Sequence, residues 1–124
     1  MARLKRTLGS VIALLVTSVA LSSCGGGGAV SQARASCRLV DRALKLQAQS
    51  EAAGLSASNR SALQADALSE LLKATPAAAA ATSADGSWNP LMTTINEAER
   101  VPLAQLVPAL TRLCQVANSS TPYL

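Results

Sequence analysis

The scarcity of aromatic side chains is the feature that most constrains what this chain can fold into. Its 124 residues include no Phe, and only Trp88 and Tyr123 are aromatic. Aromatic side chains normally supply large buried areas, so this core has to come from Leu, Val, Ile and Ala. Sheets favour β-branched and aromatic residues, whereas Ala and Leu favour helices. The sequence therefore predicts an all-α domain of thin, closely packed helices.

The spacing of the apolar residues predicts a small bundle of four to five helices. The expected helices span residues 31–53, 58–74, 75–84, 89–100 and 102–118. In the first of these, the apolar stripe is expected to extend as far as Ala48. The third is rich in alanine and buries little area per residue, so a linker over residues 76–84 is an alternative.

Several polar residues and prolines indicate where these helices begin. Ser58 or Asn59 is expected to cap the second helix. Thr75 and Asn89 each precede a proline, a pattern typical of a cap followed by the first helical residue. Pro108 falls inside the apolar stripe of the last helix, where it is expected to kink the helix or divide it.

The first twenty-five residues have the layout of an export signal. A basic start at residues 3–6 precedes an apolar stretch of about 14 residues, which is shorter than the ~20 needed to span a bilayer. The stretch leads into Leu21-Ser22-Ser23-Cys24. This motif resembles the lipobox of the bacterial lipoprotein class, which has an aliphatic residue, two small residues and a cysteine.

The resemblance implies that residues 1–23 are a signal peptide, cleaved just before Cys24. It also implies a diacylglyceryl group on the Cys24 thiol and an acyl group on the new N-terminus. Apart from this lipid, we expect no cofactor. The protein would be anchored on the outer face of the bacterial cytoplasmic membrane or in the outer membrane. Ser18-Val19-Ala20 resembles an ordinary signal-peptidase site, so secretion as a soluble protein is an alternative, and an uncleaved leader is another.

The remaining chain divides into three parts. Residues 24–30 contain four consecutive glycines and are expected to act as a flexible tether. Residues 31–118 form the helical domain, and residues 119–124 a polar, loosely held tail.

Cys37 and Cys114 both lie on predicted apolar faces. An exported protein meets an oxidising environment, so we expect a disulfide that places the first and last helices side by side. Two buried free thiols are the alternative. No metal site is expected, because the chain has no His and two Cys alone do not make a zinc ligand set.

Charge and composition argue against nucleic-acid binding and catalysis. After residue 24 the chain has eight basic and seven acidic residues, a net charge of +1, and no run of basic residues. Without His, neither a Ser-His-Asp nor a Cys-His arrangement can be built. Asp66 and Glu70 could share a helix face, but surface charge is the simpler interpretation. We therefore expect a protein that is not an enzyme.

Two features are candidates for contact with a partner. Trp88, in the string 85–90, is either an exposed anchor or a plug at the end of the bundle. A basic strip on the first helix could contact lipid headgroups or an acidic partner, or could simply be a solvated face. The strip consists of Arg34, Arg38, Arg42 and Lys45.

The function expected from these features is that of a membrane-anchored envelope lipoprotein. Its helical domain would be a non-enzymatic protein-interaction module that binds another envelope protein. A carrier of a small apolar ligand or lipid and a passive structural surface component are the alternatives. The sequence does not indicate an oligomeric state.

Overall fold

The computed structural model describes residues 28–123, which form five α-helices and one short 3-10 helix. The elements are α1 (Gly28–Ser50), α2 (Ala57–Leu72), α3 (Thr75–Ala84), η1 (Gly86–Trp88), α4 (Asn89–Glu97) and α5 (Leu103–Asn118). No strand occurs between residues 28 and 123, so the predicted all-α class is confirmed. The signal peptide and Cys24 lie outside the described residues.

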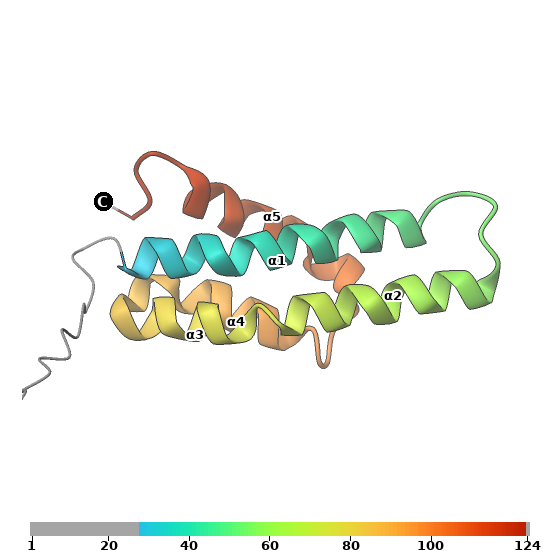
Figure 1. Ribbon diagram of the computed structural model, residues 1–124, viewed down its shortest axis with the longest axis horizontal. Coiled ribbons are helices and arrows are strands. Elements are labelled where there is room, and N and C mark those ends of the chain that lie inside the picture. The colour runs from blue at the N-terminus through green and yellow to red at the C-terminus, as the bar shows by residue number, and fades with distance from the viewer. Residues whose placement is uncertain (1–27, 124) are drawn as a thin grey trace, which may run out of the picture.

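The helices form two layers (Figure 1). In the first layer α1 runs beside α2 and α3, which follow each other end to end; α4 and α5 form the second layer behind it. Pro76 separates α2 from α3. Its ring would clash with the carbonyl four residues earlier and it has no backbone N–H to donate, so α2 cannot continue through it. At this junction the buried Ser36 hydroxyl donates a hydrogen bond to the Ala74 carbonyl, 3.1 Å away. That bond links α1 to the point at which α2 ends and α3 begins.

Small side chains make this close packing possible. Ala74, Ala78 and Ala81 are fully buried against the rest of the core. The alanine-rich segment is therefore a packed helix, and the alternative of a linker over 76–84 is wrong. The largest fully buried side chains around it are Trp88, Leu71, Leu91, Ile95 and Leu110.

The predicted disulfide is confirmed. Cys37 in α1 and Cys114 in α5 are bonded, with their Cα atoms 5.5 Å apart and a sequence separation of 77. The bond joins the first and last helices, and it encloses α2, α3 and α4 in one covalent loop.

Several predicted boundaries were wrong by a few residues. Helix α1 begins at Gly28, so it includes the last part of the predicted tether, and it ends at Ser50. Its apolar stripe stops before Ala48, which is exposed, while the neighbouring Gln47 is buried. Helix α4 ends at Glu97, earlier than predicted. Boundaries differ because the end of a helix depends on its tertiary neighbours as well as on its own sequence.

The predicted caps were also wrong. Ser56 caps α2, and its hydroxyl oxygen accepts a hydrogen bond from the Asn59 backbone N–H, 3.1 Å away. Thr75 and Asn89 are the first residues of α3 and α4, and neither helix has a side-chain cap. Pro108 does not divide α5, which is helical from Leu103 to Asn118.

Candidate functional site

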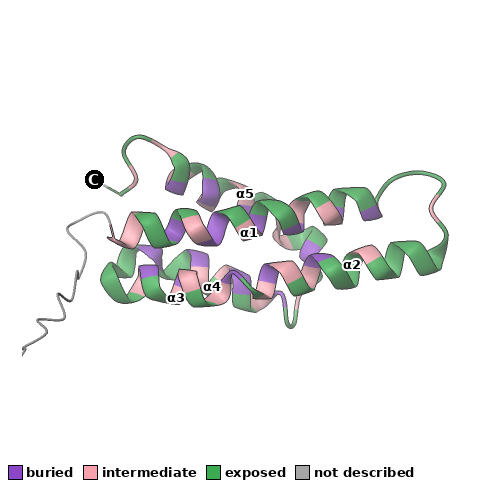
Figure 2. Ribbon diagram, in the orientation of Figure 1, coloured by how far each residue is buried: buried purple, intermediate pink, exposed green. Residues whose placement is uncertain are grey.

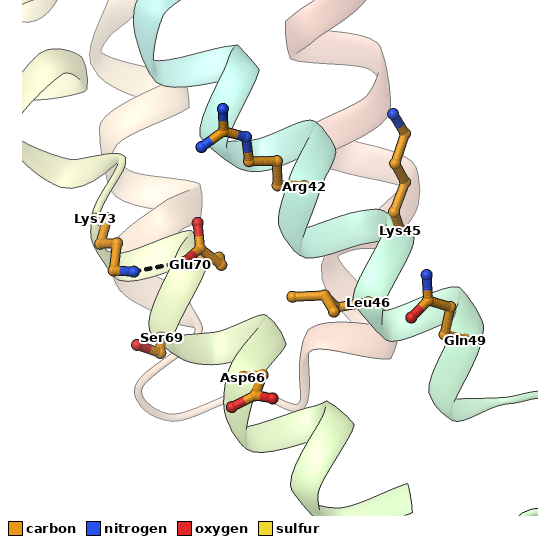
Figure 3. A pocket seen from close by; sticks show the side chains of 8 residues that line it. All are labelled: Arg42, Lys45, Leu46, Gln49, Asp66, Ser69, Glu70 and Lys73. Carbon is orange, nitrogen blue, oxygen red and sulfur yellow. Dashed lines mark hydrogen bonds and ion pairs between the residues drawn. The ribbon is translucent and has the colours of Figure 1, made fainter.

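An open groove of about 540 Å³ lies between α1 and α2, on the side of the first layer that faces away from α4 and α5 (Figure 3). Each helix contributes four residues at the spacing i, i+3, i+4, i+7, which places them on one face. The lining residues are Arg42, Lys45, Leu46 and Gln49 from α1 and Asp66, Ser69, Glu70 and Lys73 from α2.

The two sides of the groove differ in charge. The α1 side carries Arg42 and Lys45, and the α2 side carries Asp66 and Glu70. Glu70 is already ion-paired with Lys73 on its own helix. Among residues 28–123 no ion pair crosses from α1 to α2. The α1 side is therefore a positive rim. The α2 side, with two carboxylates and the Lys73 ammonium, is a net negative rim, on which Asp66 has no ion-pair partner among residues 28–123.

Leu46 forms the apolar floor of the groove. Its side chain points from α1 toward α2, between the two rims (Figure 3). It is partly buried and packs against the core. Leu63, one helical turn beyond Asp66, is also only partly buried, and it is not among the residues packed against the core. The groove thus combines an apolar centre with charged edges.

The end of the α1–α2 hairpin projects beyond the second layer (Figure 1). Residues 51–54 and 56–62 are exposed, as Figure 2 shows for the loop and the start of α2. Gly54 has a φ of +82°, a conformation that glycine adopts without strain. Inside the hairpin, the buried Gln47 amide donates to the Glu51 carboxylate at 3.0 Å. The hairpin therefore presents both helices of the groove to the surroundings.

The predicted basic strip on α1 separates into two parts. The Arg34 guanidinium donates hydrogen bonds to the carbonyls of Ala117 and Ser119, at 2.8 Å and 3.1 Å. These carbonyls lie at the carboxyl end of α5. A cation at this position donates hydrogen bonds to carbonyls that have no partner within the helix, and it interacts favourably with the negative end of the helix dipole. Arg34 thus has a structural role, so its interpretation as a partner contact is not supported. Arg38 is exposed, and Arg42 lines the groove.

Replacing Arg34 by Gln should lower the free energy of unfolding by about 1 kcal/mol, because two hydrogen bonds to the end of α5 are lost. Urea unfolding followed by circular dichroism measures the change. Arg38→Gln is the matched control, one turn further along the exposed side of α1, and should leave stability nearly unchanged. Equal effects of the two substitutions would contradict a capping role for Arg34.

Trp88 is a plug and not an exposed anchor. Only 1% of its surface is exposed, and its ring meets Tyr123 edge-on with centroids 4.6 Å apart. The turn before it is held by the Asp85 carboxylate, which accepts the Ser87 backbone N–H at 2.9 Å. This hydrogen bond lowers the pKa of Asp85 below its ordinary value. Because Tyr123 packs on Trp88, the C-terminal tail contacts the domain at Tyr123, whereas a loosely held tail was predicted.

The groove itself was missed by sequence reasoning, although Asp66 and Glu70 were expected to share a face and do so. The repeated polar spacing on both helices was the available signal.

Between residues 28 and 123 no cluster of His, Cys, Asp and Glu could hold a metal ion. No helix in that part of the chain is both long and apolar enough to span a membrane. Comparison of the chain with protein-family models, with curated proteins and with solved structures found no match.

Proposed function

We propose that this protein is a lipid-anchored lipoprotein of the bacterial envelope whose helical domain is a non-enzymatic interaction module. The observation that carries the proposal is the α1–α2 groove, with its apolar floor between rims of opposite charge. Such an open surface, with apolar and charged side chains along the faces of two helices, suits contact with the helices of another protein.

The disulfide supports export by an argument that does not depend on the leader. Disulfides persist in oxidising compartments outside the bacterial cytoplasm and are rare within it. Cys37 and Cys114 are bonded in the folded domain. The lipobox-like motif and the disulfide therefore favour the same side of the membrane.

The position of the groove also fits an anchored module. The N-terminal end of α1, which follows Cys24 in sequence, lies at the end of the molecule opposite the hairpin loop (Figure 1). A helix of 23 residues is about 35 Å long. A lipid on Cys24 would hold the start of α1 near the membrane and leave the hairpin free to reach a partner.

A carrier of small apolar ligands has less support. Sites for such ligands are usually concave and mainly apolar, and they bury most of the ligand. Here the groove is open, and five of its eight lining residues are charged. No observation specifically favours a passive structural role.

Expression of the whole chain in a bacterial host tests the anchor. We expect the protein in the membrane fraction, with a mass that begins at Cys24 and carries diacylglyceryl and N-acyl groups. Cys37 and Cys114 should be oxidised in the same molecule. Intact-mass spectrometry measures both features, and Cys24→Ala is the matched control, which should lose the lipid but keep the disulfide. A wild-type chain without lipid that begins at Leu21 would instead support secretion as a soluble protein.

A further inference from the structure

We infer that the groove binds the same groove of a second copy of this chain, which forms a homodimer with twofold symmetry. The inference rests on the proposed function and names the partner of the same surface. In a twofold interface both copies use the same surface. If residue i of the first copy contacts residue j of the second, then residue j of the first contacts residue i of the second. The surface must therefore be complementary to itself.

The two charged rims provide this complementarity. A twofold axis parallel to α1 and α2 stacks two grooves face to face, with α1 of each copy above α2 of the other. The positive rim, with Arg42 and Lys45, then lies opposite the net negative rim, with Asp66, Glu70 and Lys73. An axis perpendicular to the helices would stack α1 on α1 and oppose like charges. Charge therefore selects the first arrangement.

The register within the groove matches this arrangement. Arg42 lies across from Glu70, and Leu46 lies across from Asp66, while Lys45 lies on the edge of α1 that is turned away from α2 (Figure 3). Rotation about an axis parallel to the helices keeps every residue at its own level. Arg42 of one copy therefore meets Glu70 of the other, while Lys45 adds positive charge at the outer edge of its rim. Opposed charges steer association and fix the register of an interface.

Leu46 supplies the centre of the interface. Because it lies between the two rims, it falls close to the twofold axis and faces Leu46 of the second copy. A central apolar contact within a charged border matches the usual anatomy of protein interfaces. Leu63 adds a partly exposed apolar side chain further toward the hairpin loop.

The same axis suits two chains anchored in one membrane. It leaves both α1 helices pointing in the same direction, so both N-terminal ends lie at one end of the dimer. Two lipids at Cys24 could then insert into the same bilayer. Confinement to a surface raises the effective concentration of each copy for the other, so a modest interface suffices.

Charge exchange between rims tests the dimer in the whole chain. Two copies with different tags are co-expressed with their leaders, extracted in mild detergent and purified through one tag. Wild-type copies should co-purify, and less so at high salt. When both copies carry Arg42→Glu and Lys45→Glu, the amount of the second copy recovered should fall about tenfold. The same fall is expected when both copies carry Asp66→Lys and Glu70→Lys. One copy of each kind should restore it.

Arg112→Glu, an exposed charge reversal on α5, is the control and should not affect recovery. Circular dichroism confirms that each variant is folded. Wild-type copies that do not co-purify, or mixed variants that fail to restore recovery, would overturn the inference. Fractionation of the same cells reports on the anchor separately, so failure of the pairing and failure of the proposed function can be distinguished.

Crosslinking locates the axis. Leu46→Cys should form a disulfide with its own counterpart under mild oxidation in intact membranes, giving a species of twice the monomer mass on a non-reducing gel. Asn96→Cys, exposed on α4 in the other layer, is the matched control and should remain monomeric. Circular dichroism of the reduced Leu46→Cys protein confirms that the substitution leaves the domain folded. A folded Leu46→Cys protein that remains monomeric, or an Asn96→Cys protein that crosslinks to the same extent, would overturn the arrangement.

Discussion

Reduction of the Cys37–Cys114 disulfide should lower the free energy of unfolding by roughly 4–5 kcal/mol. The bond joins residues 77 apart, and closing a loop of this length removes much of the conformational entropy of the unfolded chain. Domains of this size are stable by only about 5–15 kcal/mol. The bond therefore supplies a large share of the stability, in a core that has few large side chains.

Thermal unfolding with and without reductant measures this contribution. The midpoint should fall by about 20 °C or more, since 1 kcal/mol moves the midpoint of a domain this small by about 4–8 °C. The two cysteines are almost fully buried, so as thiols they still fill nearly the same space. Cys24→Ala is the matched control and should leave the midpoint and its response to reductant unchanged. Equal midpoints in the oxidised and reduced forms would contradict this account.

The helices were predictable because they depend on local patterns. The run of alanines and Pro76 favoured a helix at α3, although each alanine buries little area and a linker was the alternative. The disulfide was predictable for a related reason. Cys37 and Cys114 lie on the apolar faces of two helices, and these faces meet in the single core of a small domain.

The polar contacts between distant segments were not predictable from local patterns. The Arg34 guanidinium binds the carbonyl of Ala117, 83 residues away, and the Ser36 hydroxyl binds that of Ala74, 38 residues away. Arg34 looked like any exposed basic residue on α1, because nothing nearby in the sequence reveals the end of α5. The same limit applies to the groove, whose rims come from two helices with no fixed register until they pack.

Trp88→Ala should lower the free energy of unfolding by about 3–5 kcal/mol, the range typical of removing a large buried aromatic side chain. Trp88 is the only tryptophan and the largest fully buried side chain. It lies where η1 meets α4, and the other large core residues are only leucine, isoleucine and valine. Repacking of these smaller side chains cannot refill the space, so a cavity should remain.

Tyr123→Ala is the variant that separates the plug from its cover. It removes the edge-on contact but leaves Trp88 in place, so it should cost only about 0.5–1.5 kcal/mol. Urea unfolding followed by circular dichroism compares the two variants on one scale. Tryptophan fluorescence provides a second measurement. The emission of the buried Trp88 should shift to longer wavelength when the protein unfolds. In folded Tyr123→Ala it should shift only slightly from that of the folded wild type. If Trp88→Ala were as stable as Tyr123→Ala, Trp88 would not fill the core. It would then again be a candidate for contact with a partner.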